Sequence, residues 1–202
     1  MMENAWIIPL FPLISFILLL LVGKRMKESS AFLGIALIGL SLIFSLTALW
    51  ERFSAPTFKA TFDWLQIGDV VLTAGYEVNQ LNALMLVVVS LVSLLVHIYS
   101  KGYMHGDDRF HVFYAYLGLF TFAMLALVMS PNLLQLYIFW ELVGVGSFLL
   151  IGFYFYKNEA KSAAKKAFIM TRIGDVGLFI GIILLFWQVG SFEYDVIFEA
   201  VN

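Results

Sequence analysis

The chain has 202 residues, of which 62% are apolar, 17% are aromatic and only 13% are charged, and its formal net charge at pH 7 is -2. Soluble domains contain about half apolar and about a quarter charged residues, so this composition indicates an integral membrane protein. The negative net charge provides no basic face for nucleic-acid phosphates, and a chain without cysteine cannot form disulfides, thiolate metal sites or iron–sulfur clusters.

Six apolar segments are long enough to cross a bilayer, for which an α-helix needs about 20 residues. The N-terminus lacks the basic region of a cleavable signal peptide, so we expect the first segment to remain as a helix. The sixth helix can begin several residues early, because Asn158 is a favourable N-cap. We therefore predict an all-α, polytopic membrane fold. Its helices span approximately Trp6–Val22, Ala31–Trp50, Val78–Ser100, Val112–Met129, Asn132–Tyr156 and Ala163–Val189.

The long connection Ser54–Glu77, between the second and third helices, has a different pattern. Apolar and polar residues alternate from Phe58 to Asp63, and Gly68–Asp69 can turn the chain into a second run of strand-forming residues. The pattern predicts a short β-hairpin that packs across the outer ends of the helices.

Basic residues favour one side of the predicted membrane fold. Ten of the twelve lie in or near the connections between helices one and two, three and four, and five and six: Lys24, Arg25, Lys27, Lys101, Arg109, Lys157, Lys161, Lys165, Lys166 and Arg172. Arg52 and Lys59 are on the opposite side, together with most of the acidic residues. Because lysine and arginine accumulate in cytoplasmic loops, we expect the N-terminus on the outer side of the membrane.

Glu141 is the single charged residue between Leu136 and Phe155. Its place in the fifth predicted helix is near the bilayer midplane, where an acidic residue costs about 2.5–3.5 kcal/mol to insert. Low dielectric favours the protonated carboxyl and a nearby cation favours the carboxylate, so Glu141 can exchange a proton as a neighbour moves. Gly144 leaves room beside it for water or another helix. Two interpretations stay open: a proton relay, or a protonated acid that hydrogen-bonds two helices together.

The sixth predicted helix carries Arg172 and Asp175, whose spacing permits an ion pair on one helix face. This pair either takes part in proton transfer or anchors the inner end of the helix. Gly174, Gly177 and Gly181 share a narrow strip beside Asp175, which predicts close packing against a neighbouring helix.

Three further residues are candidates for a proton path. His97, near the inner end of the third helix, titrates near neutrality, although a lone histidine there is more often an interfacial hydrogen-bonding residue. Lys165 and Lys166 usually serve topology, but either can line an entry route from the inner side. The sequence contains no glycine-rich nucleotide loop, metal-ligand cluster or nucleophile triad, so we expect no cofactor or metal site in this chain.

Five blocks of sequence, taken together, resemble the first six helices of the L subunit of bacterial NADH:quinone oxidoreductase (complex I). That subunit belongs to a family shared with the large subunits of Mrp-type sodium/proton antiporters. The resemblance covers nearly all of the chain, and the first two blocks favour the complex I subunit over its Mrp relative. The blocks are IPLFPLISF, HIYSKGYMHGD, FYAYLGLFTFAMLALV, WELVGVGSFLLIGFYF and AAKKAFIMTRIGDVGLFIGI.

The resemblance implies a proton-translocating, antiporter-like subunit of an enzyme complex in the cell membrane. Glu141 matches the family's essential carboxylate, Asp175 its helix-six aspartate and Arg172 the adjacent arginine. In the family this glutamate pairs with a lysine on a later broken helix, which would lie beyond Asn202. Other membrane subunits and the lipid bilayer are the implied partners. NADH and quinone are expected to bind other subunits, which leaves protons as the only small-molecule substrate here, and no nucleic acid is expected.

The family's repeats of five helices begin at the fourth helix. Residues 1–112 are therefore expected to hold helices one to three with the hairpin near 54–77, and residues 113–202 the start of the first antiporter-like repeat. On this interpretation the chain is a fragment that cannot pump protons alone. Two other functions stay open: an Mrp-type sodium/proton antiporter subunit, and a structural scaffold whose polar groups only bind helices together.

Overall fold

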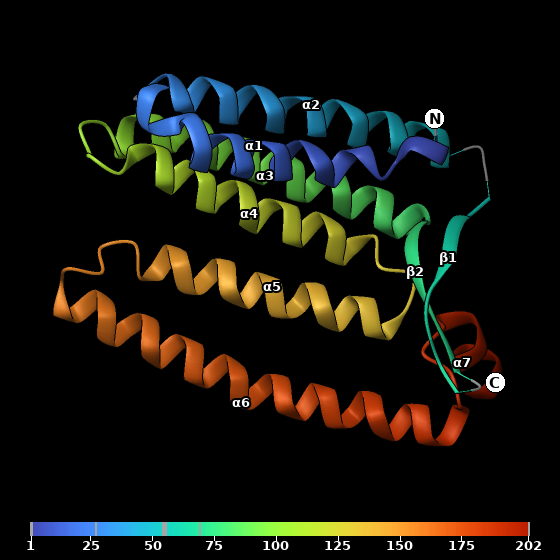
Figure 1. Ribbon diagram of the computed structural model, residues 1–202. Coiled ribbons are helices and arrows are strands. Elements are labelled where there is room, and N and C mark those ends of the chain that lie inside the picture. The colour runs from blue at the N-terminus through green and yellow to red at the C-terminus, as the bar shows by residue number, and fades with distance from the viewer. Residues whose placement is uncertain (1, 27, 54–55, 69, 202) are drawn as a thin grey trace.

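The computed structural model describes residues 2–26, 28–53, 56–68 and 70–201. Over these residues six helices are long and apolar enough to cross a membrane, which confirms the predicted all-α membrane fold. Figure 1 shows them running back and forth between two ends of the molecule. They are α1 (Ile7–Met26), α2 (Ser29–Arg52), α3 (Gln80–Tyr103), α4 (Phe110–Val128), α5 (Leu133–Ile151) and α6 (Asn158–Val189), preceded by a 3-10 turn at Met2–Asn4 and followed by a short helix α7 (Tyr194–Val201).

Helices α1–α4 form a bundle with its own core. Helix α1 packs against α2 and α4, and α2 packs against α3. Helix α4 approaches the backbone of α1 closely at Gly118, where a Cβ atom would lie only 3.0 Å from the carbonyl oxygen of Pro12. Side chains such as Leu19, Ile38 and Leu125 are completely buried between these helices.

Helices α5 and α6 lie beside this bundle as a second, thinner layer (Figure 1). Helix α5 contacts α4, for example where Gly146 packs on Phe120, whereas α6 packs on α5. Helix α5 ends at Ile151, earlier than predicted, because the chain turns at Gly152 and the Phe153 carbonyl accepts a hydrogen bond from Arg109 at 2.8 Å. Helix α6 begins at Asn158, the earlier of the two starts that the sequence allows. The N-cap is Lys157, in extended conformation, and not Asn158 as predicted.

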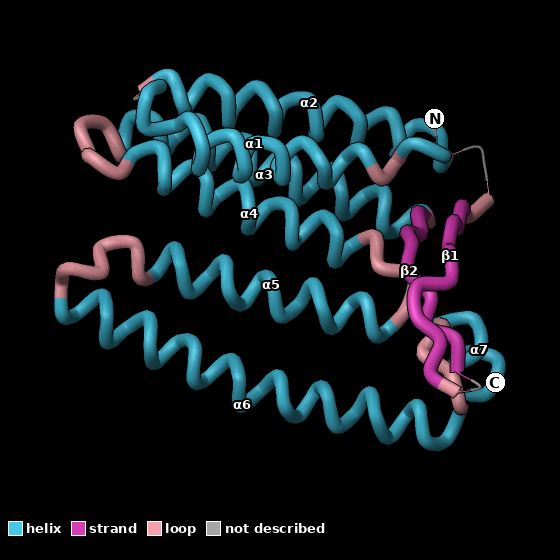
Figure 2. Tube along the Cα trace, in the orientation of Figure 1, coloured by secondary structure: helices cyan, strands magenta, loops and turns pink. Residues whose placement is uncertain are grey.

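The predicted hairpin is confirmed by strands β1 (Phe58–Ile67) and β2 (Val70–Val78), which pair in antiparallel register (Figure 2). The strands are longer than the short hairpin that was expected, and their register shifts once between Asp63 and Leu65. Gly68, before the turn, has φ of 60°, which suits a residue without a Cβ.

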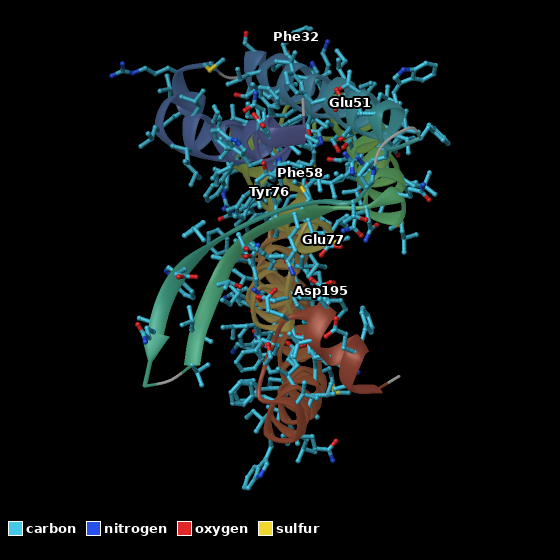
Figure 3. The ribbon with its side chains drawn as sticks, turned by 90° about the vertical axis from the view of Figure 1, so that its right-hand side faces the viewer. Phe32, Glu51, Phe58, Tyr76, Glu77 and Asp195 are labelled. Atoms are coloured by element: carbon cyan, nitrogen blue, oxygen red, sulfur yellow. The ribbon has the colours of Figure 1, made fainter. Side chains whose placement is uncertain are left out.

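The hairpin connects helices at one end of the molecule, the end that the sequence pattern predicts to be the outer one. Gln135 of α5 exchanges two hydrogen bonds with the backbone of Gly75, at 2.9 and 2.8 Å. Lys59 bridges Glu193 and Asp195 at 2.8 and 2.7 Å. In Figure 3 the two strands cross the ends of the helices and extend to one side, and α7, which carries Asp195, lies on the other side. The hairpin therefore ties the α1–α4 bundle to the far end of α6.

Candidate functional site

Glu141 and Arg172 meet between the middle parts of α5 and α6. Because α6 returns antiparallel to α5 after a six-residue turn (152–157), the two side chains reach the same depth. The Arg172 guanidinium forms an ion pair with the Glu141 carboxylate, and its Nη2 lies 3.4 Å from the Glu141 carbonyl oxygen. Both side chains are about a quarter exposed. The candidate relay residue therefore has a cationic partner on the next helix.

Asp175 shares the same cation. Its Oδ2 lies 3.6 Å from Nη1 of Arg172, and Trp140 Nε1 donates a hydrogen bond to its Oδ1 at 2.8 Å. The Asp175 side chain is only 8% exposed. One guanidinium therefore faces two carboxylates from opposite helices, so the fully ionised group would carry one net negative charge.

The space beside Glu141 that Gly144 was predicted to leave open is occupied by Arg172. A Cβ atom at residue 144 would lie 3.3 Å from Arg172 Nη2. The guanidinium also lies over the Phe168 ring, 4.7 Å from its centroid. Its Nε is buried without a hydrogen-bond partner among the described residues. A glycine on α5 thus allows the arginine to approach, but one donor remains for water or another group.

The structure brings Glu141, Arg172 and Asp175 together, and we call these three residues the α5–α6 charge cluster. One of the two interpretations from the sequence was that Arg172 and Asp175 anchor the inner end of the sixth helix. In the structure the pair lies level with Glu141, because α6 extends back to Asn158 and Arg172 is therefore several turns inside the helix.

His97 lies elsewhere, inside the α1–α4 bundle. Its ring is fully buried, and its Nδ1 lies 2.8 Å from the Ser93 carbonyl oxygen. The Tyr114 hydroxyl donates to the His97 carbonyl at 2.6 Å. The Nε2 atom has no hydrogen-bond partner in the described part of the chain. His97 is thus a buried polar residue without a contact to the charge cluster.

Lys165 and Lys166 are both exposed near the start of α6. Lys165 is seven residues before Arg172 and therefore on the same face of the helix, which is turned toward α5. It lines a cavity together with residues of α5. Lys166 is rotated by about 100° from Lys165. The structure therefore brings only Lys165 into line with the charge cluster.

Sequence reasoning missed Trp140, to which it assigned no chemistry. An indole N–H in a membrane helix needs a hydrogen-bond acceptor. This requirement is the sequence signal that could have identified Trp140 as part of the site. The predicted neighbour of the glycine strip is not found among the described residues: a Cβ atom at Gly174, Gly177 or Gly181 would meet no heavy atom within 4 Å.

Two family models match consecutive parts of the chain. The model described as NADH-ubiquinone oxidoreductase (complex I), chain 5 N-terminus, matches residues 64–114, and the model described as NADH:quinone oxidoreductase/Mrp antiporter, TM, matches residues 130–202. Together they match more than half of the chain, including the charge cluster. The chain belongs to the complex I chain 5/Mrp antiporter family.

Relatives of this complex I/Mrp family member include long subunits of quinone oxidoreductases. The chain is 47% identical over 203 residues to NAD(P)H-quinone oxidoreductase subunit 5, chloroplastic, of Mesostigma viride, with 96% of the chain and 31% of the relative covered. It is 44% identical over 201 residues to NAD(P)H-quinone oxidoreductase chain 5 of Picosynechococcus sp., with 96% of the chain and 30% of the relative covered. The chain thus spans less than a third of the length of these relatives.

A solved structure shares the fold of this family member. A chain of the membrane-bound sulfane sulfur reductase, an archaeal respiratory membrane complex, superposes with a TM-score of 0.79 at 16% identity. The match covers 95% of this chain and 38% of the other. At 16% identity, the similarity shows that the helices are arranged in the same way, but it does not assign functions to individual residues.

Proposed function

We propose that this chain acts within a proton-translocating, antiporter-like membrane subunit of an NADH:quinone oxidoreductase. In that complex, electron transfer to quinone in other subunits drives proton pumping across the membrane. The observation that carries the proposal is the position of Arg172 between two carboxylates at mid-helix. The names of the relatives support the same assignment.

The mechanism follows from the sharing of one cation. While Arg172 contacts Glu141, the carboxylate stays ionised because an opposite charge is adjacent. If the guanidinium shifts toward Asp175, Glu141 is left in low dielectric without a partner and takes up a proton. Trp140 holds the Asp175 carboxylate in place for the arriving cation. The cluster therefore has two arrangements that differ in protonation, which is what a coupled relay requires.

The remaining candidates form a proposed path toward this cluster. Lys165 lies two helical turns before Arg172 on the same face, so it can pass or repel charge along the α5–α6 seam. Lys166, on an adjoining face, is the second candidate at that end. His97 Nε2, buried without a partner among the described residues, can accept a hydrogen bond from water within the bundle.

The test of the relay is the substitution Glu141→Gln in the complete, assembled complex. Removing a proton-transfer group lowers the rate of its step by about a hundredfold or more, so we expect pumping to be lost while the complex still assembles. The readout is the number of protons moved per electron in proteoliposomes. Glu199→Gln on α7, outside the spanning helices, is the matched control. Normal stoichiometry in an assembled Glu141→Gln complex would remove the assignment, and loss of assembly alone would favour the scaffold function.

A second candidate function is that of an Mrp-type sodium/proton antiporter subunit, because the family model that matches residues 130–202 includes Mrp antiporters. Measurements in the same proteoliposomes distinguish the two functions. Sodium-dependent proton exchange without NADH would assign the chain to the antiporter class. Exchange that requires electron transfer and ignores sodium supports the complex I function.

We place the protein in the cell inner membrane, with its N-terminus and hairpin outside and with other membrane subunits as partners. Three turns, after α1, α3 and α5, share one end of the molecule, and the hairpin is at the other (Figure 1). The chain has no cysteine, so single cysteines at Lys24 and Phe62 report the two ends separately. An impermeant maleimide should label intact cells at residue 62 and only broken cells at residue 24; the reverse pattern would invert the orientation.

A further inference from the structure

A cavity of about 260 Å³ lies at the end of the molecule opposite the hairpin, between α4, α5 and the start of α6. Its lining divides into a cationic part and an apolar part. We propose that this cavity binds the phosphate headgroup of an anionic phospholipid, with an acyl chain along its apolar wall. The lining residues are Arg109, Lys161 and Lys165 on the cationic part, and Tyr116, Phe148, Leu149, Gly152, Phe155 and Ala164 on the other.

The two lysines are available for an anion. Lys161 and Lys165 are four residues apart, so they project from one face of α6, and both are exposed. No carboxylate of the described residues lies within 4.0 Å of either ammonium group. They are therefore cations at a cavity mouth without a counter-charge among the described residues.

Arg109 supplies a third cation in a fixed position. Its Nη1 donates to the Phe153 carbonyl at 2.8 Å, and its guanidinium lies 4.9 Å from the Phe153 ring centroid and 4.7 Å from that of Phe155. A guanidinium has five N–H donors, so the group held in this way still has donors for phosphate oxygens. Arginine is well suited to that contact because its planar fork matches phosphate geometry.

Acidic residues nearby do not reverse the charge of the cavity. None of the lining residues is acidic. Asp107 accepts the Arg109 backbone N–H at 2.8 Å. Asp108 and Glu159 are exposed to solvent. Three cations therefore meet an anionic ligand without a competing carboxylate in the lining.

The rest of the cavity suits a lipid better than a free anion. A Cβ atom added at Gly152 would lie 3.3 Å from the Ala164 Cβ, so the end of α5 and the start of α6 are in close contact and form a fixed floor. Phe148, Leu149 and Tyr116 continue from this floor along the spanning helices. The site is thus at headgroup depth, with its cations near the helix ends and its apolar wall toward the bilayer.

The experiment places a photoreactive p-benzoylphenylalanine at Phe155 in the full-length subunit of the assembled complex. The delipidated complex is supplied with phosphatidylglycerol or with phosphatidylcholine, and the crosslinked product is identified by mass spectrometry. We expect a phosphatidylglycerol adduct in large excess. Lys161→Gln or Lys165→Gln should each lower its yield about fivefold, since one lysine near a membrane surface contributes that factor in anionic-lipid binding. Lys161→Arg should restore the yield.

Lys157→Gln is the matched control, because Lys157 lies over the Tyr154 ring at 5.0 Å and does not line the cavity; it should leave the adduct unchanged. Three outcomes would overturn the proposal. Equal adducts from the two lipids would show an unselective apolar surface. Loss of the adduct in excess inorganic phosphate would show a free-anion site. A crosslink to a protein segment would show that another helix fills the cavity.

Discussion

The α1–α4 bundle and the α5–α6 pair handle polar groups in opposite ways. Within the bundle, several buried polar side chains are uncharged hydroxyl groups that bond to the protein: Ser41 donates to the Ile8 carbonyl at 2.9 Å, and Ser45 and Ser90 share a hydrogen bond at 2.9 Å. In the pair, a guanidinium and two carboxylates lie at mid-helix. Half of the residues in the membrane-spanning stretch of α4 are buried inside the protein, against 6% for α5 and 11% for α6.

The two regions also differ in how many neighbouring helices each spanning helix contacts. The bundle helices contact one another on several sides, so a shift of one of them would open the core. Among the described residues, helix α6 packs mainly on one spanning helix, α5, and a Cβ atom on its glycine strip would meet no described heavy atom of a neighbour within 4 Å. Arg172 and Asp175 of the charge cluster are therefore on the spanning helix with few packing contacts among the described residues.

The largest effect is expected from Arg172→Gln, which removes the cation that both carboxylates share. Breaking a buried ion pair from one side costs about 3–5 kcal/mol, because an unpaired charge remains. We expect the thermal midpoint of the assembled complex to fall and proton pumping to cease. Both are measured on the purified complex, by thermal unfolding in detergent and by protons moved per electron.

The double variant Glu141→Gln, Arg172→Gln sharpens this result, since it also removes one of the unpaired carboxylates. It should recover part of the lost stability without recovering pumping. An Arg172→Gln complex as stable as the wild type would show that the cluster is not held by its charges, and the contrast with the bundle would then lose its basis.

Much of the fold, but little of the cluster's geometry, could be predicted from the sequence. Helix positions depend on runs of apolar residues, and the hairpin depends on alternation and a glycine turn, all of which are local signals. The contact of Arg172 with Glu141 and the hydrogen bond from Trp140 to Asp175 depend on how α6 is rotated and shifted against α5. That register results from packing at Gly144 and Gly152, which no single segment specifies. The early end of α5 likewise results from Arg109, more than forty residues away.

In the bundle, the second largest effect is expected from Gly34→Ala. A Cβ atom there would lie 2.9 Å from Tyr114 Cδ1 and 3.4 Å from His97 Cδ2, both in buried side chains. Overpacking of this kind costs about 1–3 kcal/mol. Gly39→Ala on the same helix is the control, because its Cβ would meet nothing within 4 Å; it should be neutral or slightly stabilising. Equal thermal midpoints for the two variants would mean that the bundle is not tightly packed.

In the pair, Gly144→Ala should alter function more than stability. The new methyl group would lie 3.3 Å from Arg172 Nη2, and the guanidinium end of a flexible side chain can yield by a few tenths of an ångström. We expect a small loss of stability, below about 1 kcal/mol, with proton pumping reduced several-fold because the balance between Glu141 and Asp175 changes. If Gly144→Ala resembles Gly34→Ala, with lost stability and normal pumping, the pair is as rigid as the bundle.

The smallest effect is expected where the two regions are joined, at the contact of the hairpin with residues 193–195. Burial opposes the charge on Lys59, but its hydrogen bonds and charge interactions with Asp195 and Glu193 outweigh this and raise the Lys59 pKa above its usual 10.5. Burial, together with the charges of Glu77 and Glu193, raises the pKa of Tyr194 to about 12 from 10.0. Both groups bind their protons more tightly in the folded state. Their stabilisation is therefore complete below pH 10 and is lost as the pH rises toward 12.

We expect the hairpin to separate from α7 across this alkaline range while the α1–α4 bundle stays folded. Trp64 on β1 reports the separation, as the difference in fluorescence between the wild type and Trp64→Phe. Tyr194→Phe removes the ionisable hydroxyl and should shift the transition to higher pH, whereas Tyr103→Phe, in an exposed position on α3, should not. A transition unaffected by Tyr194→Phe and Lys59→Gln would mean that the two regions are held together by the hydrogen bonds of Gln135 and Asn132 with β2, and the hairpin would then join them independently of pH.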